Sequence, residues 1–194
     1  LLTEKNLMDI IQSLELIHSS PIPPEDDEID HHANYIPKVK SRYENGDYSK
    51  FPDNEKVYSK ILSQLEKYCD SSASIVSVIH GDPVFSNILL TDDGSVKYID
   101  MRGEIGGTLS LKGDKWYDFA KIYQSLDGYD EILNGSSVNI DYKQKMLLVF
   151  ENYIKKNYDS EILNWIKIIK HSLIFSLLPL HPIGKAKLYY SLIS

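Results

Sequence analysis

The chain has 194 residues, of which 42% are hydrophobic and 25% are charged, a length and composition typical of one globular domain. Its formal net charge of −7 and the lack of a long basic run argue against nucleic-acid binding through a basic patch. The single cysteine, Cys69, excludes an internal disulfide and fits a reducing compartment, so we expect a cytoplasmic protein. The most apolar segment, residues 162–180, contains Lys167, Lys170 and His171, so we expect a buried helix and no membrane span.

The first third of the chain is predicted to be helical. Thr3 can cap a helix with an apolar stripe at Leu7, Ile10, Ile11, Leu14 and Ile17. A second, more polar helix is expected from about Ile29 into residues 38–42. A third is expected after Asp53, which can cap it. Residues 25–30 are acidic, and we interpret them as a solvated loop.

The middle of the chain is predicted to hold the β structure. Residues 74–79 are rich in β-branched side chains, and residues 88–91 and 96–99 are strand-like on either side of a turn sequence. If residues 93–94 form a two-residue loop, Asn87 lies opposite Asp100, with Cβ atoms about 5 Å apart. A longer loop would shift this register.

The remainder of the chain is again predicted to be helical. An amphipathic helix is expected at Lys115–Leu126, followed by helices at about 142–156, 160–178 and 185 to the end. The pattern therefore predicts an α+β fold that is mostly α, with one small β element in mid-chain.

Three polar residues stand where apolar strand runs end. Asp82 lies in a Gly-Asp-Pro turn five residues before Asn87, and Asp100 follows the next strand. Carboxylate and amide oxygens are the ligands that Mg²⁺ prefers, and phosphoryl transfer depends largely on positioning and charge neutralisation. Aspartate is also common in turns, and we adopt that reading for Asp92 and Asp93.

These residues resemble the motifs of the aminoglycoside phosphotransferase and choline kinase superfamily, small-molecule relatives of protein kinases. The matching runs are His80-Gly81-Asp82 with Asn87, Ile99-Asp100, and Asp118-Phe119-Ala120-Lys121. More narrowly, residues 114–121 after residues 101–103 resemble the subgroup found in bacterial polysaccharide and capsule gene clusters. The resemblance implies that residues 1–194 form a single C-terminal lobe of a protein-kinase-like fold, with a catalytic loop at 80–87 and a metal hairpin at 87–100.

The resemblance also implies roles for individual residues. Asp82 would be the catalytic acid that orients the acceptor hydroxyl and takes its proton. Asn87 and Asp100 would be the magnesium ligands. His80 would brace the catalytic loop, and Asp118 would be a buried helix acid that accepts hydrogen bonds from the loop backbone. A plain surface acid is the alternative for Asp118.

The chain departs from the family pattern at two points. Met101-Arg102-Gly103 follows Asp100 where protein kinases have Phe-Gly, so kinase-style in/out switching is not expected. The second departure is that nothing in this sequence resembles the family's N-terminal β lobe. In the family, a lysine of that lobe pairs with the nucleotide phosphates. The chain starts at Leu1 inside a helical pattern, and residues 14–18 resemble the first long helix after the hinge. We therefore expect that the missing lobe precedes this sequence.

The function that the sequence favours is an ATP- and Mg²⁺-dependent phosphotransferase acting on a hydroxyl of a sugar, amino alcohol or aminoglycoside-like molecule. Its expected partners are the nucleotide, this small-molecule substrate and the N-terminal lobe, with no nucleic acid and no membrane. Two alternatives remain open. The absent lobe favours a non-catalytic kinase-like binding module. A metal-dependent hydrolase would need further ligands, and no His cluster with metal spacing appears in the sequence.

Overall fold

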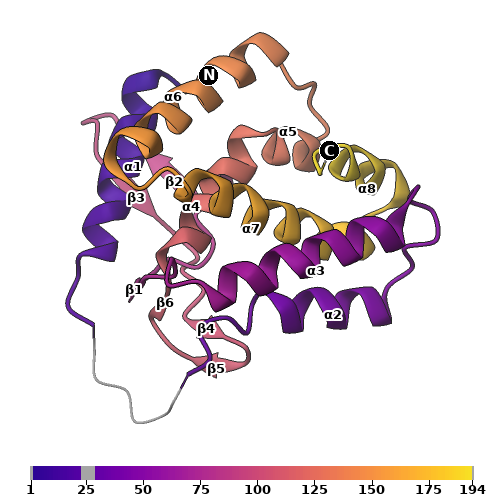
Figure 1. Cartoon of the computed structure of the whole chain (residues 1–194). Coiled ribbons are helices and arrows are strands. Elements are labelled where there is room, and N and C mark those ends of the chain that lie inside the picture. The colour runs from indigo at the N-terminus through magenta and orange to yellow at the C-terminus, as the bar shows by residue number, and fades with distance from the viewer. Residues whose placement is uncertain (1, 23–28, 194) are drawn as a thin grey trace.

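The structure is a computed structural model that describes residues 2–22 and 29–193, and it is α+β with helices predominating (Figure 1). Residues 25–28 of the acidic segment lie outside the described residues. The helices are α1 (Glu4–His18), α2 (Ile36–Asn45), α3 (Asn54–Asp70), α4 (Lys115–Leu126), α5 (Tyr129–Asn134), α6 (Ile140–Asn157), α7 (Ile162–Leu177) and α8 (Ile183–Tyr190), with 3₁₀ turns at Phe85–Asn87 and Leu178–Leu180.

Helices α4 and α7 form the centre of the molecule. They pack against each other, with α2 and α3 against α7 on one side and α6 against both on the other, as Figure 1 shows. Helix α4 is buried over most of its circumference, including Trp116 and Phe119. Burying a side chain of this size contributes about 1.5–3 kcal/mol, so α4 is a fixed platform for the loops that contact it.

Helix α1 is confirmed as predicted. The hydroxyl of Thr3 accepts a hydrogen bond from the Asn6 N–H at 3.1 Å, and the Asn6 side chain accepts one from the Thr3 N–H, which forms a capping box. Its buried residues repeat at helical spacing, at Leu7, Ile10, Ile11 and Leu14.

The second and third helices correct two expectations. Helix α2 begins at Ile36 and not near Ile29, because Pro37 lies in its first turn, where a missing N–H costs nothing. Asp53 does precede α3, but its side chain caps nothing. Its φ of 53° is left-handed, whereas a side-chain cap needs extended backbone at this position.

The strands form three antiparallel pairs within the described residues. They are β1 (Val76–Val78) with β6 (Lys112–Asp114), β2 (Ile88–Leu90) with β3 (Val96–Tyr98), and β4 (Glu104–Ile105) with β5 (Thr108–Leu109). The sequence predicted β1, β2 and β3 but not the other three. Strands of two or three residues in a glycine-rich segment have too short a pattern to detect, and their pairing depends on tertiary contacts.

The pairing of β1 with β6 joins the start of the candidate loop to helix α4. Asp114 ends β6, and its side chain accepts a hydrogen bond from the Trp116 N–H at 3.1 Å, so it caps α4. The same buried carboxylate accepts hydrogen bonds from the hydroxyls of Tyr35 and Tyr68. Burial raises the pKa of Asp114, and these hydrogen bonds partly oppose that rise.

Helix α7 accounts for the most apolar segment of the described chain. Residues Ile162–Leu180 are long and apolar enough to cross a membrane, but 67% of the most apolar window is buried inside the protein. A mostly buried segment of this kind is a core helix, as the sequence predicted.

The stability of the fold should fall in mild acid because of His171 on α7. Burial, followed by the charge of Lys170, lowers the pKa of this imidazole to about 3, against 6.5 when unfolded. Protonation therefore favours the unfolded chain, so the stabilisation is full above pH 6.5 and is lost as the pH falls toward 3. Between pH 7 and pH 5 we expect a loss of about 2 kcal/mol from this residue.

Urea unfolding of the wild type and of His171→Gln at both pH values measures this effect, because the variant should lose less stability on acidification. An equal loss in the two proteins would show that other groups cause the acid sensitivity.

Candidate functional site

The site is built on residues 79–87, which comprise the loop after β1 and the 3₁₀ turn that follows it. The loop turns at Gly81, whose φ of +82° is left-handed and readily adopted by glycine. A Cβ atom at this position would also lie 2.8 Å from the Cβ of Arg102. The segment after β3 therefore packs directly against the loop, and the Arg102 N–H donates to the carbonyl of His80 at 2.9 Å.

The side chain of Asp118 on α4 holds the backbone of this loop by hydrogen bonds. This side chain is fully buried, and its two oxygens accept hydrogen bonds from the N–H groups of His80 and Gly81, both at 2.8 Å. The surface-acid alternative for Asp118 is therefore wrong. A buried carboxylate needs such donors, since without them its desolvation would be prohibitive.

His18 is a further member of this site that the sequence analysis missed. Its Nε2 atom lies 3.0 Å from Oδ2 of Asp118, and its side chain is 5% exposed. His18 is the last residue of α1, and it continues the buried stripe of Leu7, Ile11 and Leu14. That spacing was the available signal, because a histidine at the end of an apolar stripe needs a buried polar partner.

The side chain of His80 connects the loop to the end of β3. Its Nδ1 atom accepts a hydrogen bond from the Asp82 N–H at 3.2 Å, and its Nε2 atom lies 2.9 Å from the carbonyl oxygen of Ile99. Together these contacts require the proton on Nε2, which donates to the carbonyl. His80 therefore fixes Asp82 relative to the strand that leads to Asp100.

Asp82 itself is presented toward solvent. Its side chain is 39% exposed, and Oδ1 lies 2.9 Å from the ammonium of Lys121. Lys121 follows Asp118 by one helical turn, so α4 holds both the backbone of the loop and its acid. Burial would lower the pKa of Lys121, but Tyr117 and Asp82 outweigh burial and raise it. Lys121 belongs to the motif at residues 118–121, but its contact with Asp82 was not expected from the sequence.

Asn87 ends the 3₁₀ turn and is half-buried. Its Nδ2 atom donates to the carbonyl of Asp82 at 2.9 Å, which directs the amide toward the loop and leaves its oxygen without a hydrogen-bond partner among the described residues. The turn is anchored at two further points, because the Phe85 N–H donates to the hydroxyl of Ser125 at 3.0 Å and the Ser86 N–H donates to Asp130 at 3.2 Å.

The predicted register of the β2–β3 hairpin is wrong by one residue. Ile88 pairs with Tyr98, and the Ile99 N–H donates to the carbonyl of Asn87, so Asn87 lies opposite Ile99 and not opposite Asp100. The loop has three residues, 92–94, and Gly94 has a φ of +80°. A type I turn followed by a left-handed glycine is the usual three-residue hairpin loop.

The side chain of Asp93 explains why the longer loop forms. It accepts hydrogen bonds from the hydroxyl of Thr91 and from the Ser95 N–H, and these lower its pKa to about 2. The carboxylate thus closes the turn across its base. These local hydrogen bonds stabilise the three-residue loop in place of the two-residue turn that the Asp-Gly pair suggested.

Asp100 directly follows Ile99, whose N–H donates to the Asn87 carbonyl, so Asp100 is one position beyond the residue that pairs with Asn87. It is exposed, has a left-handed φ of 55°, and its carboxylate has no hydrogen bond or ion pair within the described residues. No cluster of three or more His, Cys, Asp or Glu residues that could hold a metal occurs in the part of the chain that the structure describes. One amide oxygen and one free carboxylate nevertheless suit Mg²⁺, which keeps several waters and uses substrate phosphates as further ligands.

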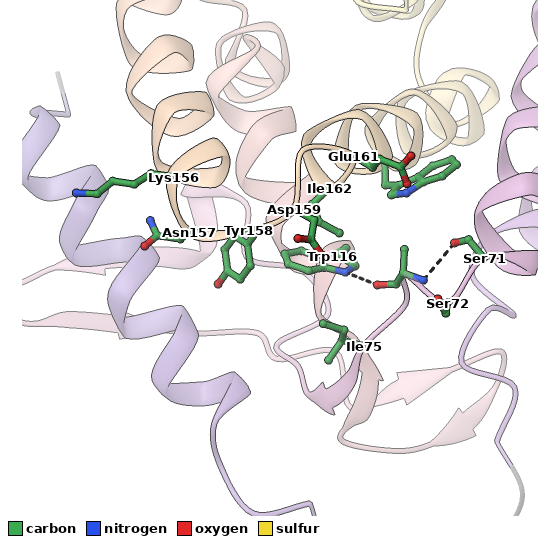
Figure 2. Close-up of a pocket in the computed structure, with 12 residues that line it drawn as sticks. Ser71, Ser72, Ile75, Trp116, Lys156, Asn157, Tyr158, Asp159, Glu161 and Ile162 are labelled. Atoms are coloured by element: carbon green, nitrogen blue, oxygen red, sulfur yellow. Dashed lines mark hydrogen bonds between the residues drawn. The ribbon is translucent and has the colours of Figure 1, made fainter.

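A pocket of about 580 Å³ lies elsewhere, between the α3–β1 and α6–α7 connections (Figure 2). Trp116, Tyr158 and Ile75 line it together with polar residues such as Asn157 and Asp159. Asp82, Asn87 and Asp100 do not line it. Asp82 is partly exposed and Asp100 is exposed, so both acids are accessible at the surface of this chain.

Comparisons with known proteins add nothing to this assignment, since no protein-family model and no curated protein matches the chain. The interpretation of the site rests on its motifs and its geometry.

Removing the charge of Asp118 should destabilise the protein. In Asp118→Asn the amide nitrogen faces backbone donors, so at least one buried N–H loses its acceptor. We expect a loss of about 2–4 kcal/mol in the free energy of unfolding, measured by urea denaturation. Asp92→Asn, at an exposed turn, is the matched control and should change stability by less than about 0.5 kcal/mol. Equal stability of the two variants would contradict the anchoring role of Asp118.

Proposed function

We propose that the protein is an ATP- and Mg²⁺-dependent phosphotransferase acting on a hydroxyl group of a small molecule, with this chain as the C-terminal lobe of a kinase-like fold. The observation that carries the proposal is the presentation of Asp82. Its side chain is 39% exposed, while the loop around it is tied to Asp118, His80 and Asn87 by hydrogen bonds of 2.8–3.2 Å. A solvent-facing acid on an otherwise immobilised loop is preorganised for chemistry, not for packing.

Asp82 would hold the acceptor hydroxyl in line with the γ-phosphorus of ATP. The acceptor oxygen forms the new O–P bond, the bond from the γ-phosphorus to the bridging oxygen breaks, and ADP leaves. The hydroxyl proton passes to the Asp82 carboxylate. Lys121 would orient that carboxylate through the 2.9 Å contact and limit its rotation. Because the transition state is loose, most of the rate gain would come from positioning.

Asn87 and Asp100 would hold the magnesium ion through the amide oxygen and the free carboxylate. A bound magnesium ion neutralises charge on the nucleotide phosphates and orients them. The hydrogen bond from Asn87 Nδ2 to the Asp82 carbonyl would keep this ligand in register with the catalytic loop. His80 would do the same for the strand end that precedes Asp100.

Loss of Asp82 should abolish most of the activity. In the natural full-length protein, Asp82→Ala should lower kcat for transfer of radiolabelled γ-phosphate to hydroxyl compounds by at least about 10²-fold. The KM for ATP should change little, since Asp82 contacts the acceptor. Asp92→Ala is the control and should keep wild-type turnover. Near-normal kcat in Asp82→Ala would remove this residue from the mechanism.

Nucleotide binding should require both magnesium and Asp100. ATP should raise the melting temperature of the natural protein only when Mg²⁺ is present. Asp100→Ala should raise the Mg²⁺ concentration for half-maximal stabilisation by about tenfold or more. Asp92→Ala should behave as the wild type.

The same measurement separates the alternatives. Magnesium-dependent stabilisation by ATP without any phosphoryl transfer would favour the binding module. No stabilisation by ATP under any condition would overturn the phosphotransferase proposal.

A further inference from the structure

Three basic side chains gather around one buried tyrosine beside Asp82. Tyr117, on α4, is 3% exposed, and its hydroxyl lies 3.4 Å from the ammonium of Lys38 on α2. The ammonium of Lys121 lies 5.8 Å from the centre of the same ring. Arg102 packs against Gly81 of the loop and acts electrostatically on Tyr117. We call Lys38, Arg102 and Lys121 the basic cluster.

Among the residues that the structure describes, only one member of the basic cluster forms an ion pair with a carboxylate. Lys121 pairs with Asp82, but no carboxylate within the described residues forms an ion pair with Lys38 or Arg102. The nearby Asp130 is oriented by the Ser86 N–H, and Asp100 is the proposed magnesium ligand. An excess of positive charge at one place is notable in a chain whose net charge is −7.

The pKa values in the cluster reflect this excess. Burial alone would raise the pKa of the Tyr117 hydroxyl, but the charges of Lys38, Lys121 and Arg102 outweigh burial and lower it. Tyr117 supports the charged form of Lys38, yet burial, Lys121 and Arg102 together lower the pKa of Lys38. Lys121 and Arg102 therefore disfavour the charge on Lys38, and a bound anion beside Lys38 would offset their effect.

We propose that the basic cluster binds a phosphate or carboxylate group of the acceptor, so that the substrate is an anionic hydroxyl compound. This inference rests on the proposed function, because Asp82 marks where the acceptor hydroxyl lies. Lys121 contacts both Asp82 and the ring of Tyr117, so an anion held by the cluster lies beside the reacting hydroxyl. The positive charge disfavours cationic acceptors such as amino alcohols and aminoglycosides.

Calorimetry without nucleotide tests the cluster directly, using inorganic phosphate and sn-glycerol 3-phosphate, with glycerol and choline as neutral and cationic comparisons. Both anions should bind, whereas glycerol and choline should bind at least tenfold more weakly. Lys38→Met and Arg102→Met should each weaken anion binding about tenfold, as expected for one charge-assisted hydrogen bond. Lys40→Met is the matched control, because Lys40 is an exposed lysine on the same helix, and it should bind as the wild type.

The anion has two possible sources, the acceptor and the nucleotide, and a competition experiment distinguishes them. ATP added with magnesium should leave sn-glycerol 3-phosphate bound if the cluster belongs to the acceptor site. Displacement by ATP would overturn the inference, as would equal affinity for glycerol 3-phosphate and choline. In turnover assays, Lys38→Met should raise the KM of an anionic acceptor about tenfold and leave the KM of ATP unchanged.

Different experimental results would overturn this inference and the proposed function. Absence of phosphoryl transfer to every compound, with anion binding intact and sensitive to Lys38→Met, would overturn the enzyme assignment and leave the basic cluster as an anion-binding site only. Efficient transfer to neutral or cationic acceptors, with no effect of Lys38→Met or Arg102→Met, would overturn the inference alone. Both variants replace long side chains at positions that are not fully buried, and their urea midpoints check that they fold.

Discussion

The candidate site depends on one buried carboxylate. Asp118 has no exposure to solvent, and it is stabilised by two backbone N–H groups of the loop and by His18. The dependence is mutual, because those N–H groups in turn need an acceptor in the interior. A buried carboxylate loses stabilisation if its hydrogen-bond donors move away from it. It therefore fixes the positions of His80 and Gly81, and through them the direction in which Asp82 leaves the loop.

Helix α4 combines several of these tasks in little more than two turns. Asp114 caps the helix and binds the buried hydroxyls of Tyr35 and Tyr68, so it joins α4 to the first half of the chain. Asp118, four residues later, holds the loop. Lys121, three residues further on, contacts the acid that the loop presents. The helical repeat of 3.6 residues brings positions 114, 118 and 121 near one face, so one rigid element aligns core, loop and acid.

The charges at the site have different surroundings and therefore different uses. Asp114 and Asp118 are buried and bound by donors, which suits structural roles. Asp82 is half-exposed and paired with a single lysine, and Asp100 is exposed and unpaired within the described residues, which leaves both able to interact with ligands. Beside them, Lys38 and Arg102 supply positive charge that forms no ion pair with a carboxylate in residues 2–22 and 29–193. This arrangement is the physical basis for proposing both a phosphoryl transfer and an anionic acceptor.

The sequence alone determined most of the helices and the strands β1, β2 and β3, but not helix α5 or the strands β4, β5 and β6. Strong periodicity and local capping predicted α1 and α4, because a helix forms its own hydrogen bonds and needs only one buried face. The strand before His80 and the hairpin after Asn87 were also predicted, since their apolar runs are bounded by turn residues. The polar residues at the ends of these strands followed from the same pattern.

Only the tertiary structure decided how these residues meet. The hairpin register depended on a side-chain bond from Asp93 that competes with the two-residue turn, so the predicted pairing of Asn87 with Asp100 was wrong. The partnership of His18 with Asp118 spans 100 residues, and the approach of Lys38 to Tyr117 spans 79. Local sequence patterns report which face of an element is apolar, but they carry no information about which distant polar groups will share a buried position, because that is settled when the helices pack.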